Sequence, residues 1–316
     1  MEPMLEVEDL RVYYKSIWGD YRSVDGASFL VHPNEVFGIA GESGCGKSTL
    51  VEGILRLVKP PGYIKSGRIV FKNIELLSLD QEEVRKLQWK EFSYIPQGSM
   101  NSLNPVLRIG EQMLDAVTSH TDKAKKEATN MALSSLKEVG LPVEVSRMYP
   151  HELSGGMKQR VIIAMATLLK PSLVVADEPV TALDVVVQKS ILQSIASLRD
   201  RYGIAIIFVA HDLAAHAEIV DTLAIMYAGK IAEIGTVYDI FLNPLHPYSK
   251  LLIQAIPSIG KKVVKGIPGL APSPLDWPSG CRFHPRCPQV MPMCAKEEPP
   301  LKEISQGRHI ACHLLK

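Results

Sequence analysis

The amino-acid sequence predicts an α/β fold around a mostly parallel sheet, because short β-branched runs alternate with segments of helical period. The strand candidates are residues 35–40, 173–176 and 204–210. The last two are nearly continuous apolar runs, the pattern of strands buried on both faces of a sheet. Residues 122–139 place apolar side chains on one helical face and lysines on the other. Residues 222–235 are predicted to form a hairpin that turns around Gly229.

Composition and charge narrow the class of protein. The 316 residues are enough for about two domains, and 46% hydrophobic with 22% charged residues excludes global disorder. The net charge of +1 argues against a nucleic-acid partner. The longest nearly unbroken apolar run, residues 161–169, is too short to cross a bilayer. The first residues lack the features of a secretion signal, so we expect a cytoplasmic chain.

Proline and cysteine are distributed unevenly. Twelve of the 22 prolines lie between residues 241 and 300, and four of the five cysteines follow Gly280. We therefore expect an α/β domain over residues 1–240 and a small, irregular C-terminal domain over residues 241–316. Trp277 and Phe283 argue against a disordered tail, because a solvated tail has little use for large aromatic side chains.

Residues 41–48, Gly-Glu-Ser-Gly-Cys-Gly-Lys-Ser, fit the phosphate-loop pattern G-x-x-x-x-G-K-[ST] between a predicted strand and a predicted helix. Glycines let the backbone curl so that successive N–H groups face an anion, and the following helix adds its positive end. Lys47 can reach the β- and γ-phosphates, and the Ser48 hydroxyl can bind Mg²⁺. The predicted ATP-binding residues here are Gly41, Ser43, Gly44, Cys45, Gly46, Lys47, Ser48 and Thr49.

Two further strands end in polar residues. Asp177 and Glu178 follow the apolar run 173–176, at the carboxyl end of a predicted strand, where doubly wound sheets bind ligands. We expect Asp177 to hold Mg²⁺ and Glu178 to be the base that orients or deprotonates the attacking water. His211 follows the last core strand and is predicted to sense the γ-phosphate.

The stretch Leu153-Ser154-Gly155-Gly156-Met157-Lys158-Gln159-Arg160 resembles the signature sequence of ABC-type ATPases. Ser154 is the expected N-cap of a helix whose free N–H groups and dipole point outward. The resemblance implies that ATP lies between the phosphate loop of one subunit and the signature of another, here including Gly155 and Gly156. It therefore implies a partner ATPase subunit, either a copy of this chain or a paralogue.

Three other residues match the same family. Gln97, within Tyr94-Ile95-Pro96-Gln97, resembles the glutamine that contacts Mg²⁺ and is placed among the catalytic residues. Asp184, within Ala182-Leu183-Asp184, resembles the loop that crosses the dimer interface. Tyr14 stands where the family places an aromatic ring against adenine, with Tyr13 as an adjacent rival. The resemblance also implies an antiparallel β subdomain and a helical subdomain over about residues 98–168.

Three further sequence stretches resemble the dipeptide/oligopeptide branch of ABC importers. Residues 101–106, 243–248 and 280–288 carry this likeness, and Val180 departs from it because that branch usually has Thr there. The resemblance implies ATP hydrolysis that powers solute import through two membrane permease subunits, with a solute-binding protein delivering the cargo. It places the chain peripherally at the cytoplasmic face of the membrane. Relatives carry peptides, nickel or oligosaccharides, so the cargo stays open.

Four C-terminal cysteines form a candidate metal site. Their spacing is C-x5-C-x6-C-x17-C, and the four are Cys281, Cys287, Cys294 and Cys312. Clustered thiols in a cytosolic chain favour metal binding over disulfides. The tight knuckles of structural zinc are absent, and the resemblance points to a 4Fe–4S cluster, with zinc or free thiols as alternatives. Such a cluster would brace the small domain, or it would sense redox state or iron.

Two functions from other classes compete with transport. A soluble ABC ATPase of translation or DNA repair usually has two cassettes or a long coiled-coil insertion, and the sequence shows neither. An iron–sulfur redox sensor with a regulatory nucleotide core would not need an intact Glu178 and His211.

Overall fold

The computed structural model describes residues 2–256 and 266–315. Its contacts divide the chain into two compact units. The first unit comprises Met1–Val31, Phe37–Ser78 and Ala210–Lys316, and the second comprises His32–Val36 and Leu79–Val209. The first unit thus contains the phosphate loop, His211 and the described part of the C-terminal region. The second contains the acidic strand end and the signature stretch.

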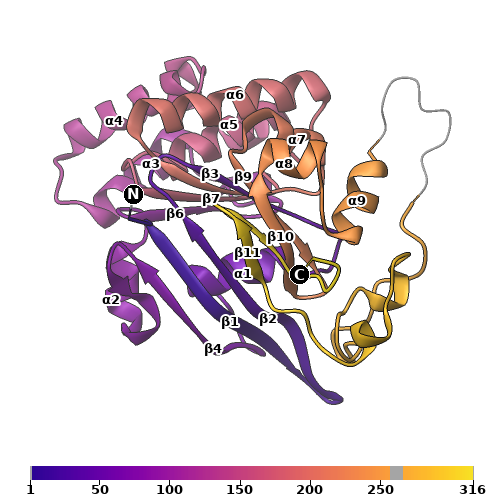
Figure 1. Ribbon diagram of the computed structural model, residues 1–316. Helices are drawn as coiled ribbons and strands as arrows, with labels where there is room; N and C mark the ends of the chain where they lie inside the picture. The colour runs from indigo at the N-terminus through magenta and orange to yellow at the C-terminus, as the bar shows by residue number, and fades with distance from the viewer. Residues whose placement is uncertain (1, 257–265, 316) are drawn as a thin grey trace. The chain divides into compact units, whose positions relative to one another are not determined.

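An antiparallel sheet opens the first unit, and its strands run in the order β2-β1-β4-β5. The strands are β1 (Leu5–Ser16), β2 (Gly19–Val31), β4 (Gly62–Phe71) and β5 (Ile74–Glu75). Leu5 pairs with Val31 on one side and Phe71 on the other, so β1 is central, as Figure 1 shows. Both β1 and β2 bury alternate side chains, the period-2 pattern of a sheet with one covered face. This sheet is the antiparallel β subdomain that the sequence led us to expect.

A second group of strands in the first unit runs in the order β3-β9-β10-β12-β11. They are β3 (Val36–Ala40), β9 (Thr222–Tyr227), β10 (Lys230–Thr236), β12 (Arg308–Ile310) and β11 (Lys302–Ser305). β3 is parallel to β9, whereas β9 and β10 form the predicted hairpin, which turns at Ala228-Gly229. Its helices are α1 (Lys47–Ile54), α7 (Leu213–Ile219), α8 (Val237–Leu242) and α9 (Pro247–Gln254).

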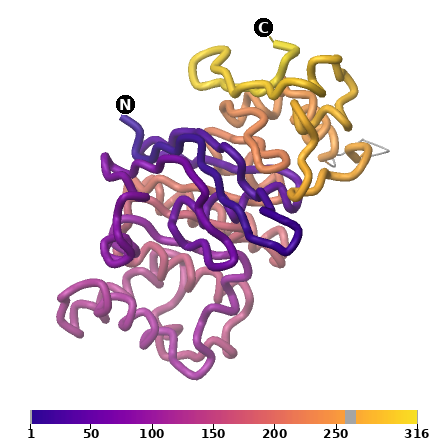
Figure 2. The backbone as a smooth tube through the Cα atoms, turned by 90° about the horizontal axis from the view of Figure 1, so that it is seen from below, coloured from indigo at the N-terminus to yellow at the C-terminus, as the bar shows by residue number. Residues whose placement is uncertain are grey.

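The C-terminal region shares the core of the first unit. Ile310 pairs with Glu233, so β12 extends the edge of the β9–β10 hairpin. Phe283 is buried against the rings of Tyr227 and Tyr248, with centroids 5.2 and 5.4 Å away. Figure 2 shows the yellow segment folded back beside the orange one. A proline-rich segment with few regular hydrogen bonds is held here by aromatic packing on the preceding sheet.

Three parallel strands form the sheet of the second unit in the order β8-β7-β6. They are β6 (Phe92–Ile95), β7 (Leu173–Asp177) and β8 (Ala205–Val209), and every residue of β7 and β8 is buried. Five α-helices accompany them among the described residues: α2 (Gln81–Leu87), α3 (Ile109–His120), α4 (Lys125–Glu138), α5 (Gly155–Ala166) and α6 (Val185–Tyr202). The continuous apolar runs therefore became fully buried parallel strands, as predicted.

Helix α4 begins three residues later than the periodicity suggested. Thr121 closes α3, because its backbone N–H and its hydroxyl both donate to the Val117 carbonyl. Residues 121–124 are not helical, and α4 starts at Lys125 after the extended N-cap residue Ala124. Helices α4 and α5 pack together, and the Ser135 hydroxyl donates to the Ala164 carbonyl over 2.7 Å. Within the described residues no helix is long and apolar enough to cross a membrane.

Candidate functional site

The phosphate loop lies between β3 and α1, and glycine is required at both of its ends. Gly41 has φ 155° and Gly46 has φ 103°, a region that side chains with a Cβ rarely adopt. A Cβ on Gly41 would lie 2.1 Å from the Met226 carbonyl oxygen, and one on Gly46 would lie 2.3 Å from that of Ser23. The backbone of the first unit therefore packs directly against the loop and leaves no room for a side chain at either position.

Lys47 is held across this loop. Its Nζ donates to the carbonyl oxygens of Gly41 at 2.9 Å and Glu42 at 3.1 Å, and the residue is only 5% exposed. The Nδ1 atom of His211 lies 3.4 Å from the same Nζ. The two residues that the sequence assigned to the γ-phosphate are thus neighbours, although 164 positions separate them. A preorganised cation in a phosphate loop needs little rearrangement to receive a polyphosphate.

The remaining loop residues differ in exposure. Ser43 and Gly44 are exposed, Ser48 and Thr49 are half-buried, and Cys45 is buried. The Sγ atom of Cys45 lies 3.8 Å from Lys47 Nζ, and burial raises the pKa of this thiol. Cys45 therefore fills the loop as a neutral thiol.

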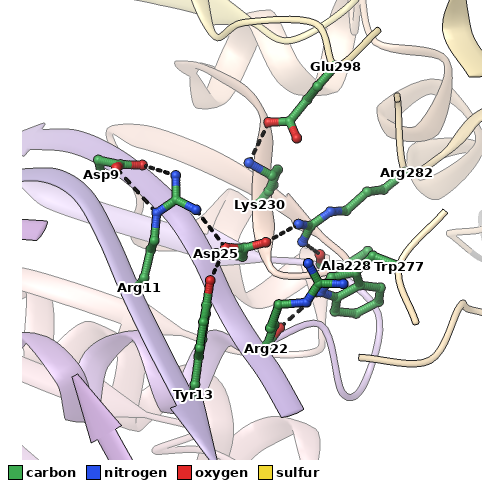
Figure 3. A network of polar contacts seen from close by, with 10 residues as sticks. All are labelled: Asp9, Arg11, Tyr13, Arg22, Asp25, Ala228, Lys230, Trp277, Arg282 and Glu298. Carbon is green, nitrogen blue, oxygen red and sulfur yellow. Dashed lines mark hydrogen bonds and ion pairs between the residues drawn. The ribbon is translucent and has the colours of Figure 1, made fainter. Parts of the chain in front are cut away.

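Tyr13 and Tyr14 have different surroundings, which separates the two adenine candidates. Tyr13 is buried, and its hydroxyl donates to Asp25 over 2.5 Å (Figure 3). Burial opposes ionisation of Asp25, but the hydrogen bonds from Tyr13 and Arg282 lower its pKa overall. The hydroxyl of Tyr14 instead lies 3.4 Å from Thr49 Oγ1, beside the first turn of α1. The ring next to the phosphate loop is therefore that of Tyr14.

In the second unit, Asp177 ends β7 and Glu178 follows it in a strained conformation. Glu178 has φ 52°, unusual for a residue with a Cβ, and its N–H donates to the Val209 carbonyl over 2.8 Å. Its Oε2 accepts a hydrogen bond from Thr181 Oγ1 at 3.0 Å, and the residue is 6% exposed. The Tyr94 hydroxyl lies 3.4 Å from Asp177 Oδ2. Backbone strain of this kind persists only where the surrounding structure enforces it.

The signature stretch begins α5 as the sequence indicated. Ser154 is the N-cap, and its Oγ accepts from the Met157 N–H at 3.3 Å. Gln159 of the same helix is buried and accepts from Ser99 Oγ at 3.1 Å, which ties α5 to the segment after Gln97. Gln97 itself is exposed. Asp184 is also exposed and is the N-cap of α6, accepting from the Val187 N–H at 3.0 Å.

The four C-terminal cysteines are free thiols. Burial raises the pKa of Cys281 to about 11, although a hydrogen bond with the Phe283 backbone opposes the shift. Soft thiol donors suit a metal cluster, but metal ligands must be thiolates. Within residues 2–256 and 266–315 no group of three or more His, Cys, Asp or Glu side chains is arranged to hold a metal ion. The donor chemistry fits a metal centre and the arrangement in this structure does not.

Sequence patterns did not single out three of the residues around these sites. Thr181 contacts Glu178, Tyr94 approaches Asp177, and His216 lies beneath β3. His216 is fully buried, its Nδ1 and Nε2 lie 3.0 Å from Asp212 O and 3.3 Å from Ile39 O, and burial lowers its pKa to about 4. Tyr94 and Thr181 lie within or next to motifs, so proximity to a motif is the signal that would have found them.

Two protein families match this chain. The ABC transporter family matches residues 24–181. The C-terminal region of oligopeptide/dipeptide transporters matches residues 232–294.

Whole-length relatives are similar as well. The dipeptide transport ATP-binding protein DppD of Caldanaerobacter subterraneus subsp. tengcongensis is 43% identical over 99% of this chain and 98% of its own length. The oligopeptide transport ATP-binding protein OppD of Escherichia coli is 42% identical over 98% of this chain and 93% of its own length. A solved dimer of a bacterial ABC transporter cassette is 26% identical with a TM-score of 0.67, covering 74% of this chain and 99% of that one.

Proposed function

Because the chain belongs to the ABC transporter family, and within it to the dipeptide and oligopeptide transport ATP-binding proteins, we propose that it hydrolyses ATP to power peptide import through separate membrane permease subunits. The observation that carries this proposal is the phosphate loop with Lys47 held across it beside His211. The relatives' names support a di- or oligopeptide as the cargo, and the permeases hold the transport path.

Each site residue then has a role in ATP hydrolysis. Lys47 and the loop N–H groups bind the β- and γ-phosphates, and Tyr14 stacks on adenine. Oxygen atoms of Ser48, Gln97 and Asp177 suit Mg²⁺, which neutralises charge on the phosphate oxygens when bound. Glu178 orients or deprotonates the attacking water. Thr181 positions the Glu178 carboxylate through its hydrogen bond.

A second ATPase subunit completes the nucleotide site in this proposal. Ser154 begins α5 at an exposed position, and a helix N-terminus of this kind attracts phosphate. The solved cassette with the same fold is described as a dimer, which supports this arrangement. ATP would bind between the phosphate loop of one subunit and the signature of its partner. The dimer would lie at the cytoplasmic face of the membrane, bound to two permeases that receive cargo from a solute-binding protein.

The test compares purified wild type with Lys47→Ala. The wild-type chain should hydrolyse ATP slowly, with a rate per chain that rises with protein concentration because two chains must meet. Lys47→Ala should lose this activity and nucleotide binding together. Affinity purification from solubilised membranes should bring down permease subunits. If the chain is an active ATPase but translation or DNA-repair factors copurify with it instead of permeases, this result would contradict the transport function.

A metal cluster in the C-terminal region is a separate proposal, supported by the soft donor chemistry of the four thiols. Protein purified without oxygen should be brown and should contain iron and sulfide in equal amounts. Colourless protein with one zinc ion and no iron would contradict the iron–sulfur cluster. Cys287→Ser should abolish folding if the cluster braces the fold, and it should alter the oxygen response of the ATPase if the cluster is a sensor.

A further inference from the structure

The phosphate loop carries a carboxylate. Glu42 is the second residue of the loop, and its backbone carbonyl is one of the two that hold Lys47 Nζ. A negative side chain in a loop that binds an anion opposes binding, because like charges repel and protein surroundings screen them less than water does. A phosphate loop with this residue therefore needs a means of neutralising it.

Arg286, between Cys281 and Cys287, neutralises this carboxylate. Its Nη1 donates to Glu42 Oε2 at 2.7 Å and its Nη2 donates to Oε1 at 2.9 Å, so the pair is bidentate. The side chains are 6% and 26% exposed, and the hydrogen bond to Glu42 raises the pKa of Arg286. A partly buried bidentate pair keeps its geometry better than a fully exposed pair does.

The guanidinium is itself held in place. Its Nε donates to the Pro268 carbonyl at 2.8 Å, Nη2 lies 3.4 Å from the Ile267 carbonyl, and Nη1 lies 3.3 Å from the Tyr227 hydroxyl. Every nitrogen of Arg286 therefore has an acceptor. These partners leave the side chain little freedom to turn away from Glu42.

Tyr248 holds the backbone of the same loop residue. Its hydroxyl accepts a hydrogen bond from the Glu42 N–H at 2.9 Å, and its side chain is fully buried. Tyr248 belongs to α9 and Arg286 to the segment that follows Gly280. The C-terminal region thus contacts one residue of the phosphate loop twice, once through the backbone and once through the side chain.

We propose that Arg286 is a positioning residue for nucleotide binding, which neutralises Glu42 and so sets the affinity of the phosphate loop for ATP. The inference rests on the proposed ATP site. It gives the C-terminal region a direct part in nucleotide affinity, separate from any metal that its thiols bind. The effect should be larger for a triphosphate than for ADP, because the triphosphate carries more negative charge.

The experiment measures equilibrium binding of the magnesium complexes of a non-hydrolysable ATP analogue, AMP-PNP, and of ADP to the full-length chain by calorimetry. Arg286→Gln leaves the Glu42 charge in place, and AMP-PNP affinity should fall about tenfold, with a smaller loss for ADP. Adding Glu42→Gln to Arg286→Gln removes that charge and should restore AMP-PNP affinity to within about twofold of wild type. If Arg286→Gln lowered the affinity through a general loss of structure, adding Glu42→Gln would not restore it.

Arg308→Gln is the matched control. Arg308 also lies in the C-terminal region and is buried, and its Nη2 donates to Glu233 Oε1 at 3.1 Å, outside the phosphate loop. It should lower thermal stability as Arg286→Gln does, yet leave AMP-PNP affinity unchanged. Should Arg286→Gln fail to fold, Glu42→Gln alone carries the test and should bind AMP-PNP at least as tightly as wild type.

The outcomes separate this inference from the proposed function. Wild-type protein that binds neither nucleotide contradicts the ATP site itself. Wild-type protein that binds AMP-PNP while Arg286→Gln binds it equally well overturns the inference alone. A double variant that stays as weak as Arg286→Gln also overturns it, because the loss would then not come from the charge of Glu42.

Discussion

Each unit has a helix N-terminus that follows a glycine or a serine, but the two N-termini differ in how far they are buried. In the first unit, Gly46 precedes α1 with backbone packed against the place of a missing Cβ, and Lys47 is almost fully buried. In the second unit, Ser154 precedes α5 at an exposed position, and a Cβ on Gly155 would meet nothing closer than 3.5 Å. One helix end is enclosed by the chain and the other is open.

This difference agrees with the proposed function, in which ATP binds between two subunits. The enclosed end has its own cation, a histidine neighbour and a carboxylate neutralised by the C-terminal region. The open end has its N-cap at Ser154, and under the proposed function it would contact the phosphates of a nucleotide bound by a second subunit. If the proposed function holds, an enclosed site and an open helix end on one chain would together favour dimerisation on nucleotide binding.

Glu178→Gln should have the largest effect on turnover. The amide keeps the shape of the side chain but cannot take a proton, so the ATPase rate should fall by about 10²–10³-fold while nucleotide affinity is retained. The variant should also collect as a dimer with ATP, which gel filtration detects. Normal turnover by Glu178→Gln would show that this carboxylate is not the base.

Gly46→Ala tests the enclosed helix end and Gly155→Ala is its counterpart at the open end. Gly46 has φ 103° and a backbone oxygen 2.3 Å from the added Cβ, so the substitution should cost about 2–3 kcal/mol of unfolding free energy. Gly155→Ala should stay within about 0.5 kcal/mol of wild type. Denaturant titration measures both, and equal losses would remove the distinction between the two ends.

The pH dependence of stability tests the packing beneath the phosphate loop. The pKa of His216 is about 4 in the folded chain against an ordinary 6.5. Between these values the unfolded chain binds a proton that the folded chain refuses, so the free energy of unfolding falls as pH decreases from 6.5 toward 4. The loss from this residue is at most about 3 kcal/mol. In His216→Gln, the free energy of unfolding measured by urea titration should depend less on pH between 4 and 6.5. An unchanged pH dependence would show that other residues cause the acid sensitivity.

Ser154→Ala should lower stability less than Gly46→Ala does. It removes one helix cap, which costs about 1 kcal/mol. ATPase activity should fall further than this cost explains, because the open end contributes only in the dimer. AMP-PNP binding by the separate chain should remain as in wild type. Calorimetry and an ATPase assay over a range of protein concentrations distinguish the two effects.

Local patterns in the sequence determined much of the fold and of the candidate site. The phosphate loop, the acidic strand end, the N-cap at Ser154 and the buried strands β7 and β8 follow from glycine geometry, capping and continuous apolar runs. These signals are short in sequence, so neighbouring residues suffice to read them. The assignment of Gln97 and Asp184 came from resemblance to a family, since an exposed Gln or Asp has no distinctive pattern of its own.

Only the tertiary structure decided how distant segments contact one another. It separated Tyr13, engaged with Asp25, from Tyr14, which lies beside Thr49. It also brought Arg286 to Glu42, a pair 244 positions apart. Charge and ring interactions of this kind act through space, and a lone Arg among prolines carries no mark of its partner. The C-terminal prolines and cysteines indicated a distinct segment. The contact of this segment with the phosphate loop depends on tertiary packing, in which the rings of Tyr227, Tyr248 and Phe283 hold the segment against the rest of the first unit.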